Sequence, residues 1–434
     1  MKTLRNLLWA WVLCLLLPVR AGAGLTIEIT SGVEGATPIA IVPFGWQGKA
    51  PPPVDVAAVV SADLARSGRF APLPEQDLIS RPTRGSEVNF RDWRLMGVGS
   101  LLVGRLVPLG DGRIRLEFQL FDTIRGTQLA GYSLTVRPGN LRQAAHYVSD
   151  VVYETLTGER GAFQTRIAYV TVTGTGKARR YRLQVADADG YGQKTIVSSP
   201  EPLMSPAWSP DGRRLAYVSF EGKHSAIYVQ EVATGKRVEV SRDRGINGAP
   251  AWSPDGTRLA LTLSRDGNPE IYILDLRNGQ RRRLTHHPAI DTEPVWEPDG
   301  NGILFTSDRG GGPQIYRIPL SGDRARRLTF EGGYNASPDV SPDGKRIAFV
   351  HRDAQGRYRI ALLDRESGQM QLLSDGRLDE SPSFAPNGSM VLYATEYNGR
   401  GVLAAVSVDG RVSQRLRFQA GEVREPAWSP FERR

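Results

Sequence analysis

Cysteine is almost absent from this sequence. The single cysteine, Cys14, lies in an apolar stretch near the N-terminus, and the chain has only five histidines. One cysteine cannot form an intramolecular disulfide, and few thiol and imidazole groups remain for a closed metal cage. We therefore expect a protein that is stabilised by its hydrophobic core and that holds no resident metal and no cofactor.

The motifs of several enzyme classes are also missing. The chain has no Gly-x-Ser-x-Gly, no His-Glu-x-x-His, no Gly-x-Gly-x-x-Gly after a strand and no Gly-x-x-x-x-Gly-Lys-Ser/Thr. The stretch Asp187 to Gly192, DADGYG, has the composition of a calcium loop, but its spacing fits a tight hairpin better. The sequence thus argues against an enzyme.

A basic stripe with interleaved aromatic residues is absent as well. The formal net charge is +9 and falls to +6 without Lys2, Arg5 and Arg20. A modest excess spread over the chain fits ordinary solvated faces, an acidic partner or an anionic envelope surface better than nucleic acid. We expect no binding of nucleic acid.

The N-terminal apolar run is too short for a lasting membrane span. It follows a basic start at Lys2 and Arg5, ends at Pro18, and is followed by the cleavage pattern Ala21-x-Ala23. A spanning helix needs roughly 20 apolar residues, whereas a signal peptide has this layout. We expect residues 1–23 to be a signal peptide, with cleavage after Ala23 and export to the periplasm.

An internal repeat dominates the second half of the chain. The letters PAWSPDG at Pro206 to Gly212 return unchanged at Pro250 to Gly256. The aromatic position of this motif recurs every 44 residues, at Trp208, Trp252, Trp296, Val340, Phe384 and Trp428. Each motif precedes β-rich runs and turns, so the repeat predicts about four short antiparallel strands, which make one blade of a β-propeller.

The ends of the repeat region are complementary. The sixth motif, at Trp428, has no chain left for further strands, whereas residues 165–199 supply three strands without a motif before them. Pairing the two ends closes a ring of six blades over residues 162–434 and removes open sheet edges. The acids of the turns, Asp211, Asp255, Asp299 and Asp343, recur with the scaffold, so we interpret them as hairpin caps rather than catalytic groups.

Residues 24–161 predict a smaller α/β domain. Apolar positions from Val56 to Leu64 form a helical stripe that stops at Gly68, and three β-rich runs follow from Ser100 to Val136. Asn140 is placed to cap a closing helix. The predicted fold class is therefore an all-β six-bladed propeller preceded by a smaller α/β domain.

The loops that lead into each motif are candidates for a binding surface. Repeat positions that hold the same residue type in every blade serve the fold. The leading loops, in contrast, differ from blade to blade around the central channel. They mix hydrogen-bonding and apolar groups, as a protein interface does. The candidate residues are Met204, Asn247, Asp291, Thr292, Tyr334, Asn335 and Asp379.

Several stretches together resemble the TolB family of periplasmic Tol-Pal components. They include SGVEGATPIAIVPF, LTGERGAFQTRIAYV, PLMSPAWSPDGRRLAYVSFE, DTEPVWEPDG and EPAWSP, and the resemblance spans the chain after the leader in the same domain order. It implies a non-enzymatic adaptor that binds the lipoprotein Pal through the propeller and TolA through its N-terminal segment. The implied role is to keep the outer membrane intact and to constrict it during cell division.

The resemblance also implies particular residues for each partner. Pal-facing positions fall at Asn247, Ala249 and Thr292, whereas Ile246 stands where the family pattern has a polar histidine. The TolA-binding segment falls at Leu25, Thr26, Ile27, Glu28 and Ile29, whose alternating pattern suits addition to a sheet edge.

Two other functions stay open on the residues alone. One is an envelope propeller enzyme, a hydrolase or lyase acting on polysaccharide, which requires an acid pair or histidine cluster along the channel. The other is a propeller that binds a sugar or an ion in the channel. The sequence shows no obvious acid pair for the enzyme.

Overall fold

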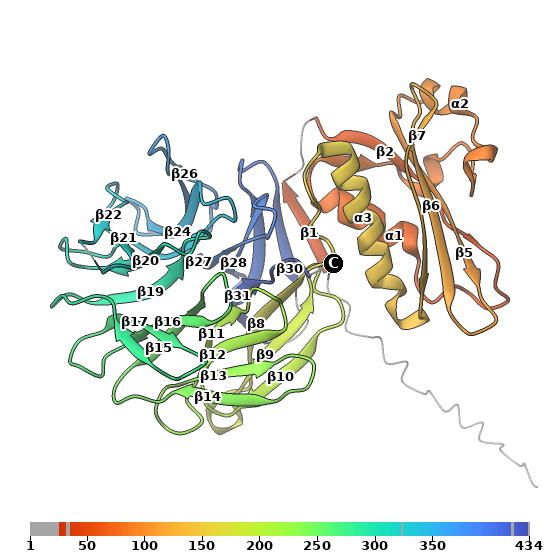
Figure 1. Ribbon diagram of the computed structural model, residues 1–434. Helices are drawn as coiled ribbons and strands as arrows, with labels where there is room; N and C mark the ends of the chain where they lie inside the picture. The colour runs from red at the N-terminus through yellow and green to blue at the C-terminus, as the bar shows by residue number, and fades with distance from the viewer. Residues whose placement is uncertain (1–25, 32–34, 323, 418–420, 433–434) are drawn as a thin grey trace, which may run out of the picture.

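The computed structural model describes residues 26–31, 35–322, 324–417 and 421–432, and it contains a ring of sheets beside a smaller α/β domain (Figure 1). The predicted signal peptide lies outside the described residues. Among the helices that are described, none has both the length and the hydropathy required to cross a bilayer.

The N-terminal domain is one mixed sheet with helices on both faces. Its sheet has the order β4-β2-β5-β6-β7, and β3 also pairs with β5. Strands β2, β3, β4 and β5 pair in parallel, and β5 to β7 form the predicted antiparallel meander. The elements are β2 (Thr37–Ile41), β3 (Gly45–Trp46), α1 (Val56–Arg66), β4 (Phe70–Pro72), α2 (Phe90–Leu95), β5 (Ser100–Pro108), β6 (Ile114–Asp122), β7 (Thr127–Val136) and α3 (Leu141–Thr157).

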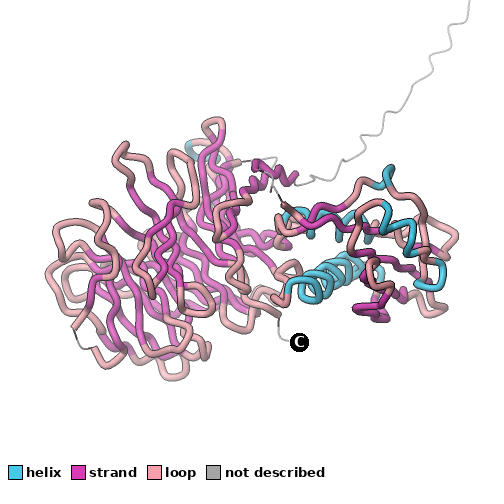
Figure 2. The backbone as a smooth tube through the Cα atoms, turned by 90° about the horizontal axis from the view of Figure 1, so that it is seen from above, coloured by secondary structure: helices cyan, strands magenta, loops and turns pink. Residues whose placement is uncertain are grey.

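Helices α1 and α3 cover the sheet face that is turned toward the propeller (Figure 1, Figure 2). The core below them joins Val60 and Leu64 of α1, Leu116 and Phe118 of β6, and Val148 of α3. Burying each of these side chains contributes about 1.5 to 3 kcal/mol, so this face stabilises the domain.

The starts of α1 and α3 are capped differently, and the predicted cap at Asn140 is not formed by its side chain. Asp55 accepts a hydrogen bond from the Ala58 backbone N–H at 3.0 Å and so caps α1. Asn140 stands at the start of α3, but its side chain makes no capping bond, because a short turn at Pro138–Asn140 already leads into that helix.

The ring has six blades, as the 44-residue period predicts. The blade sheets are β31-β8-β9-β10, β11 to β14, β15 to β18, β19 to β22, β23 to β26, and β27 to β30. Their bounds are β8 (Arg166–Thr173), β9 (Arg180–Asp187), β10 (Lys194–Ser199), β11 (Leu203–Trp208), β12 (Arg214–Ser219), β13 (Ala226–Glu231), β14 (Arg237–Ser241), β15 (Asn247–Trp252), β16 (Arg258–Leu263), β17 (Glu270–Asp275), β18 (Arg281–Arg283), β19 (Asp291–Trp296), β20 (Gly302–Ser307), β21 (Gln314–Pro319), β22 (Arg326–Arg327), β23 (Asn335–Val340), β24 (Arg346–Arg352), β25 (Tyr358–Asp364), β26 (Met370–Leu372), β27 (Glu380–Phe384), β28 (Met390–Tyr397), β29 (Arg400–Ser407), β30 (Ser413–Arg417) and β31 (Glu422–Trp428).

The C-terminal strand closes the ring. Strand β31 pairs antiparallel with β8, so one blade combines residues from both ends of the repeat region. Closure leaves no unpaired innermost strand in the ring.

The repeated motif locks each blade to its neighbour. The indole N–H of Trp252 donates to the Ala207 carbonyl of the preceding blade at 3.1 Å, and Trp208 and Trp296 do the same. In the turn, Asp255 accepts bonds from Ser253 and the Thr257 N–H, which is the predicted capping role. PAWSPDG is therefore scaffold.

The N-terminal domain contacts the end of the ring that carries the SPDG-type turns, here called the turn face. Asn387, in the turn of the fifth motif, donates to the Arg160 carbonyl at 3.0 Å. Arg142 of α3 pairs with Asp189 in the β9–β10 hairpin. The opposite end, here called the leading face, carries the leading loops.

Candidate protein-binding surfaces

Each innermost strand carries the same backbone irregularity. The pairing register shifts inside β11, β15, β19, β23, β27 and β31. At each shift one non-glycine residue has positive φ, between 44° and 54°, followed by a proline: Ser205, Ala249, Glu293, Ser337, Ser381 and Glu425. These residues and their prolines line a central channel of about 170 Å³. Left-handed backbone at six equivalent positions costs energy, so closure of the ring must hold it in place.

Two of the channel residues are glutamates, although sequence reasoning found no acid pair there. Glu293 accepts from the Ser337 N–H at 2.8 Å, from the Ser337 hydroxyl at 2.7 Å and from Thr306 at 2.8 Å. Glu425 accepts from the Ser205 N–H. Both carboxylates thus join neighbouring innermost strands.

Burial raises the pKa of Glu425 to about 7, and the charges of Glu380 and Glu293 act in the same direction. The hydrogen bond from Ser205 opposes this shift. Near neutral pH the channel therefore holds less than its full formal negative charge.

Four of the predicted contact residues are buried beneath the leading face. Asn247, Asp291, Asn335 and Asp379 are each at most 1% exposed. They occupy equivalent positions in four successive repeats, since their numbers differ by 44. In the chain alone these side chains therefore hold the loops in shape, and the predicted contact role of all four stays a prediction.

The hydrogen bonds of these residues explain their burial. Asn247 accepts from Ser241 at 2.8 Å and donates to the Asp243 carbonyl at 2.7 Å, which closes its loop. Asp379 accepts from Ser374 and Thr395, each at 2.5 Å. Burial raises the pKa of Asp379 and also that of Asp291, which pairs with Arg309.

Several exposed side chains of the leading face are apolar, among charged residues such as Arg244, Arg377 and Glu380. Met204, Ile246, Ile290 and Leu378 are 40, 49, 49 and 39% exposed. Ile246, Ile290 and Leu378 share the slot just before the buried one, and Tyr334 fills it in the repeat between them. A cluster of exposed apolar groups around a polar channel is the layout of a protein interface.

Thr292 and Ala249 lie between this apolar cluster and the channel. Both are partly exposed, and Ala249 has the left-handed backbone of the channel slot. Thr262 donates to the Thr292 hydroxyl at 3.4 Å. Their position supports the predicted contact role, together with that of Met204.

The predicted N-terminal binding segment forms a strand on the propeller. Strand β1 (Thr26–Ser31) pairs antiparallel with β30 and becomes the fifth strand of the last blade (Figure 1). Glu28 lies 3.6 Å from Arg415, and Thr30 donates to the Ser413 carbonyl at 3.1 Å. Leu25 lies outside the described residues. The alternating pattern that predicted addition to a sheet edge thus corresponds to a strand that pairs with β30 of the same chain.

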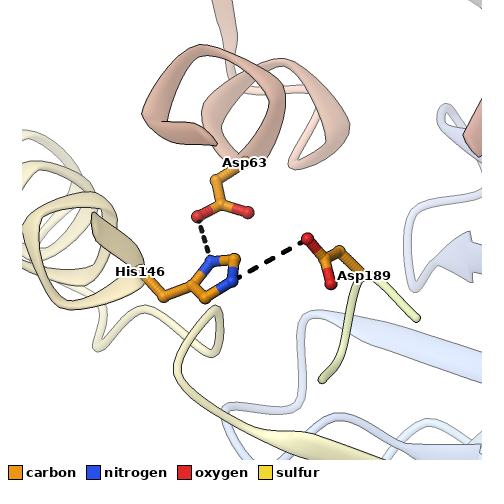
Figure 3. Close-up of side chains that lie close together, drawn as sticks. All are labelled: Asp63, His146 and Asp189. Atoms are coloured by element: carbon orange, nitrogen blue, oxygen red, sulfur yellow. Dashed lines mark hydrogen bonds and ion pairs between the residues drawn. The ribbon is translucent and has the colours of Figure 1, made fainter. Parts of the chain in front are cut away.

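A buried charged cluster joins the two domains (Figure 3). His146 of α3 lies with Nδ1 2.7 Å from Asp63 of α1 and with Nε2 3.8 Å from Asp189 of the propeller. Burial alone lowers the pKa of His146, but the charge of Asp63 and the hydrogen bond to it outweigh burial and raise the pKa overall.

Two guanidinium groups balance these carboxylates. Arg66 lies 3.0 Å from Asp63, and Arg142 pairs with Asp189. One imidazole and two carboxylates close together could ligate a metal ion. The arginines already supply the positive charge that such an ion would bring, so we interpret the cluster as an interdomain ion-pair network.

Comparison with known proteins decides the family. A model of the TolB beta propeller domain matches residues 153–432, and a model of the TolB amino-terminal domain matches residues 25–129. The chain belongs to the TolB family. This assignment indicates a non-enzymatic protein.

Individual relatives agree with the TolB assignment. "Tol-Pal system protein TolB" of Thioalkalivibrio sulfidiphilus is 57% identical over 247 residues, 57% of this chain and 56% of that protein. The protein of the same name from Xanthomonas oryzae pv. oryzae is 55% identical over 239 residues, 54% of each chain. The matched stretch spans about half the length of these relatives.

A solved structure extends the likeness to nearly the whole chain. The crystal structure of TolB from Acinetobacter baumannii superposes with a TM-score of 0.88 at 43% identity, covering 94% of this chain and 100% of that chain. The arrangement of the TolB fold described above is therefore shared by an experimental structure.

Proposed function

We propose that this TolB-family chain is a non-enzymatic periplasmic adaptor of the Tol-Pal system. Its leading face binds the lipoprotein Pal, and its N-terminal segment binds TolA, which supports outer-membrane integrity and constriction during cell division. The relatives named Tol-Pal system protein TolB support the assignment to this system. The observation that carries the adaptor role is the exposed apolar cluster of Met204, Ile246, Ile290 and Leu378.

The position of the leading face favours this role. The N-terminal domain contacts the propeller at the turn face, through Asn387 and Asp189. The leading face therefore stays open to a partner. Exposed apolar groups supply the centre of an interface, and residues such as Thr292 and Glu380 supply polar groups around it.

The N-terminal segment suits a second partner. Strand β1 has one edge on β30 and is the outermost strand of its sheet. A segment that already forms a strand can pair through its backbone with the strand of another protein. Because β1 is antiparallel to β30, its start at Thr26 lies beside Arg417, toward the leading face.

Binding of purified soluble Pal tests the leading face. Ile246→Arg with Ile290→Arg is expected to weaken binding by at least about 100-fold, because two charges replace apolar groups at the centre. Val238→Arg is the matched control, since Val238 is 55% exposed on an outer strand away from the channel. Equal affinity of the double variant and the control would reject this face.

Two further measurements test the remaining parts of the proposal. Deletion of residues 25–31 should abolish binding of the soluble TolA domain while Pal binding persists. The mature protein isolated from the periplasm should begin at Gly24, and a mature chain that retains residues 1–23 would contradict the predicted signal peptide.

A further inference from the structure

Strand β7 of the N-terminal domain is an open sheet edge. It pairs with β6 on one side and is the last strand in the sheet order. Its residues are exposed or only partly buried along the whole length from Thr127 to Val136. Every second backbone N–H and C=O of an edge strand points away from its sheet, so β7 presents a row of groups that another strand can pair with.

The sequence of β7 lacks the usual protection of such an edge. The strand TQLAGYSLTV contains no charged residue and no proline, and Leu129 and Tyr132 are exposed. Among the described strands the other outer edges are short or charged, for example β4 with three residues, β18 with Arg281–Arg283 and β22 with Arg326–Arg327. The edge of β30 is covered by β1.

A hollow lies beside the same edge, on the sheet face away from α1 and α3. It measures about 540 Å³ and takes its lining from β5, β6, β7 and the segment before α2, including Arg84, Arg105, Gln128, Gly131 and Ser133. Gly131 contributes no side chain, which keeps the hollow open at β7. A strand added to β7 would place alternate side chains over this hollow.

We propose that β7 is a docking edge for an extended segment of a partner protein, one with an uncharged β-forming centre and acidic residues at its ends. Arg125 precedes β7 with a side chain that is 78% exposed and lies 3.5 Å from Asp122, and the exposed Arg137 follows β7. Arg84 is exposed at the hollow, and Arg105 lies there paired with Glu117 at 2.5 Å. Positive charge at both ends of an uncharged edge complements acidic ends on the added strand.

A second copy of this chain fits the edge less well. Antiparallel pairing of β7 with β7 of another molecule would bring Arg125 of one copy beside Arg137 of the other at both ends. Like charges directly opposite each other destabilise a strand pair. This edge lies on the other domain from the leading face and from β30, so the inference is independent of the proposed Pal and TolA sites.

A synthetic peptide of sequence DEVTVTVED, acetylated and amidated, is the probe. With the full mature protein at low ionic strength, it should slow amide hydrogen exchange within Ala130–Val136. The same peptide with methyl groups on alternate backbone nitrogens should not bind, and a version with lysine for every acid should bind at least about tenfold more weakly.

A matched pair of protein variants isolates the charge effect. Arg125→Ser with Arg137→Ser should weaken peptide binding about tenfold, whereas Arg81→Ser with Arg91→Ser, which removes the same charge elsewhere in the domain, should not. The proposal is overturned if no binding occurs at millimolar peptide or if protection appears at Ser413–Arg417 instead. Concentration-dependent dimers that protect β7 without peptide would also overturn it, since the occupant would then be a second copy.

Discussion

Gln414 of β30 donates its side-chain amide to the backbone carbonyl of Arg66, the last residue of α1. The strand that carries the N-terminal segment is therefore tied directly to the N-terminal domain. Arg66 in turn pairs with Asp63, which contacts His146. The docked segment and the interdomain network thus depend on one helix.

Replacing Gln414 tests this connection. Gln414→Leu leaves the Arg66 carbonyl without its donor and should lower the free energy of unfolding by about 1 to 3 kcal/mol. It should also speed amide exchange in β1 and β30. Gln371→Leu, at an exposed position of an outer strand, is the control and should change stability by at most about 0.5 kcal/mol. Equal effects of both variants would mean that the bond does not connect the domains.

Adjacent residues of one loop should separate stability from binding. Asn247→Ala removes the side chain that closes its loop and should lower the free energy of unfolding by about 1 to 3 kcal/mol. Ile246→Ala should leave stability within about 0.5 kcal/mol but weaken Pal binding by about tenfold. Urea unfolding and titration calorimetry measure the two quantities. The reverse pattern would show that Asn247, and not Ile246, is the contact.

The stability of the domain interface should depend on pH through His146. Its pKa is raised in the folded protein, so its stabilising contribution is complete below about pH 6.5 and is lost as the pH rises through the raised pKa. Other groups near it titrate too: burial raises the pKa of Asp150 to about 6 and raises that of Asp187, whereas nearby positive charges overcome burial and lower that of Asp189.

Comparison with His146→Gln separates the contribution of the histidine to the pH dependence of stability from the contributions of those neighbours. The wild type should be more stable than the variant by about 1 to 2 kcal/mol at pH 6, and the difference should shrink at pH 8.5. Urea unfolding at the two pH values measures it. A difference that stays constant or grows with pH would contradict a protonated, ion-paired His146.

Glu425, at the central channel, should also make the free energy of unfolding depend on pH. Its pKa of about 7 lies above that of an exposed glutamate, so its carboxylate disfavours the folded state increasingly as the pH rises from about 4.5 to 7. Glu425→Gln should therefore stabilise the protein by about 1 to 3 kcal/mol at pH 8 and have little effect at pH 4.5. Destabilisation at pH 8 would show that the bond from Ser205 outweighs the burial cost.

The repeat made most of the fold predictable from the sequence. The constant spacing from Trp208 to Trp428 gave the number of blades, and the strands missing after Trp428 matched the extra strands at the start of the ring. Both inferences need only local pattern and closure. The pairing of β1 with β30 was not predictable, because it joins residues nearly 400 positions apart through backbone bonds that leave no side-chain signature.

The exposure of the candidate contact residues was predicted in part. Asn247, Asp291, Asn335 and Asp379 put an Asn or Asp at the same position of four successive repeats, and that repetition was the available signal that they serve the scaffold. The same alignment would have found Ile246, Ile290 and Leu378, which share an apolar slot. Burial decides which slot faces solvent, and it depends on how each loop folds over the channel. The interdomain cluster was missed because Asp63 and His146 meet only where α1 packs on α3, and Asp189 reaches them only through the docking of the two domains.

Site-specific photo-crosslinking to Pal tests the central claim most directly. A photoreactive amino acid placed at Ile290 on the leading face should crosslink to Pal in high yield, whereas the same group at Asp299 on the turn face should give none. Loss of the Ile290 adduct on adding unlabelled wild-type protein would confirm a specific complex. Crosslinking from position 299 and not from 290 would contradict the assignment of the leading face as the Pal-binding surface.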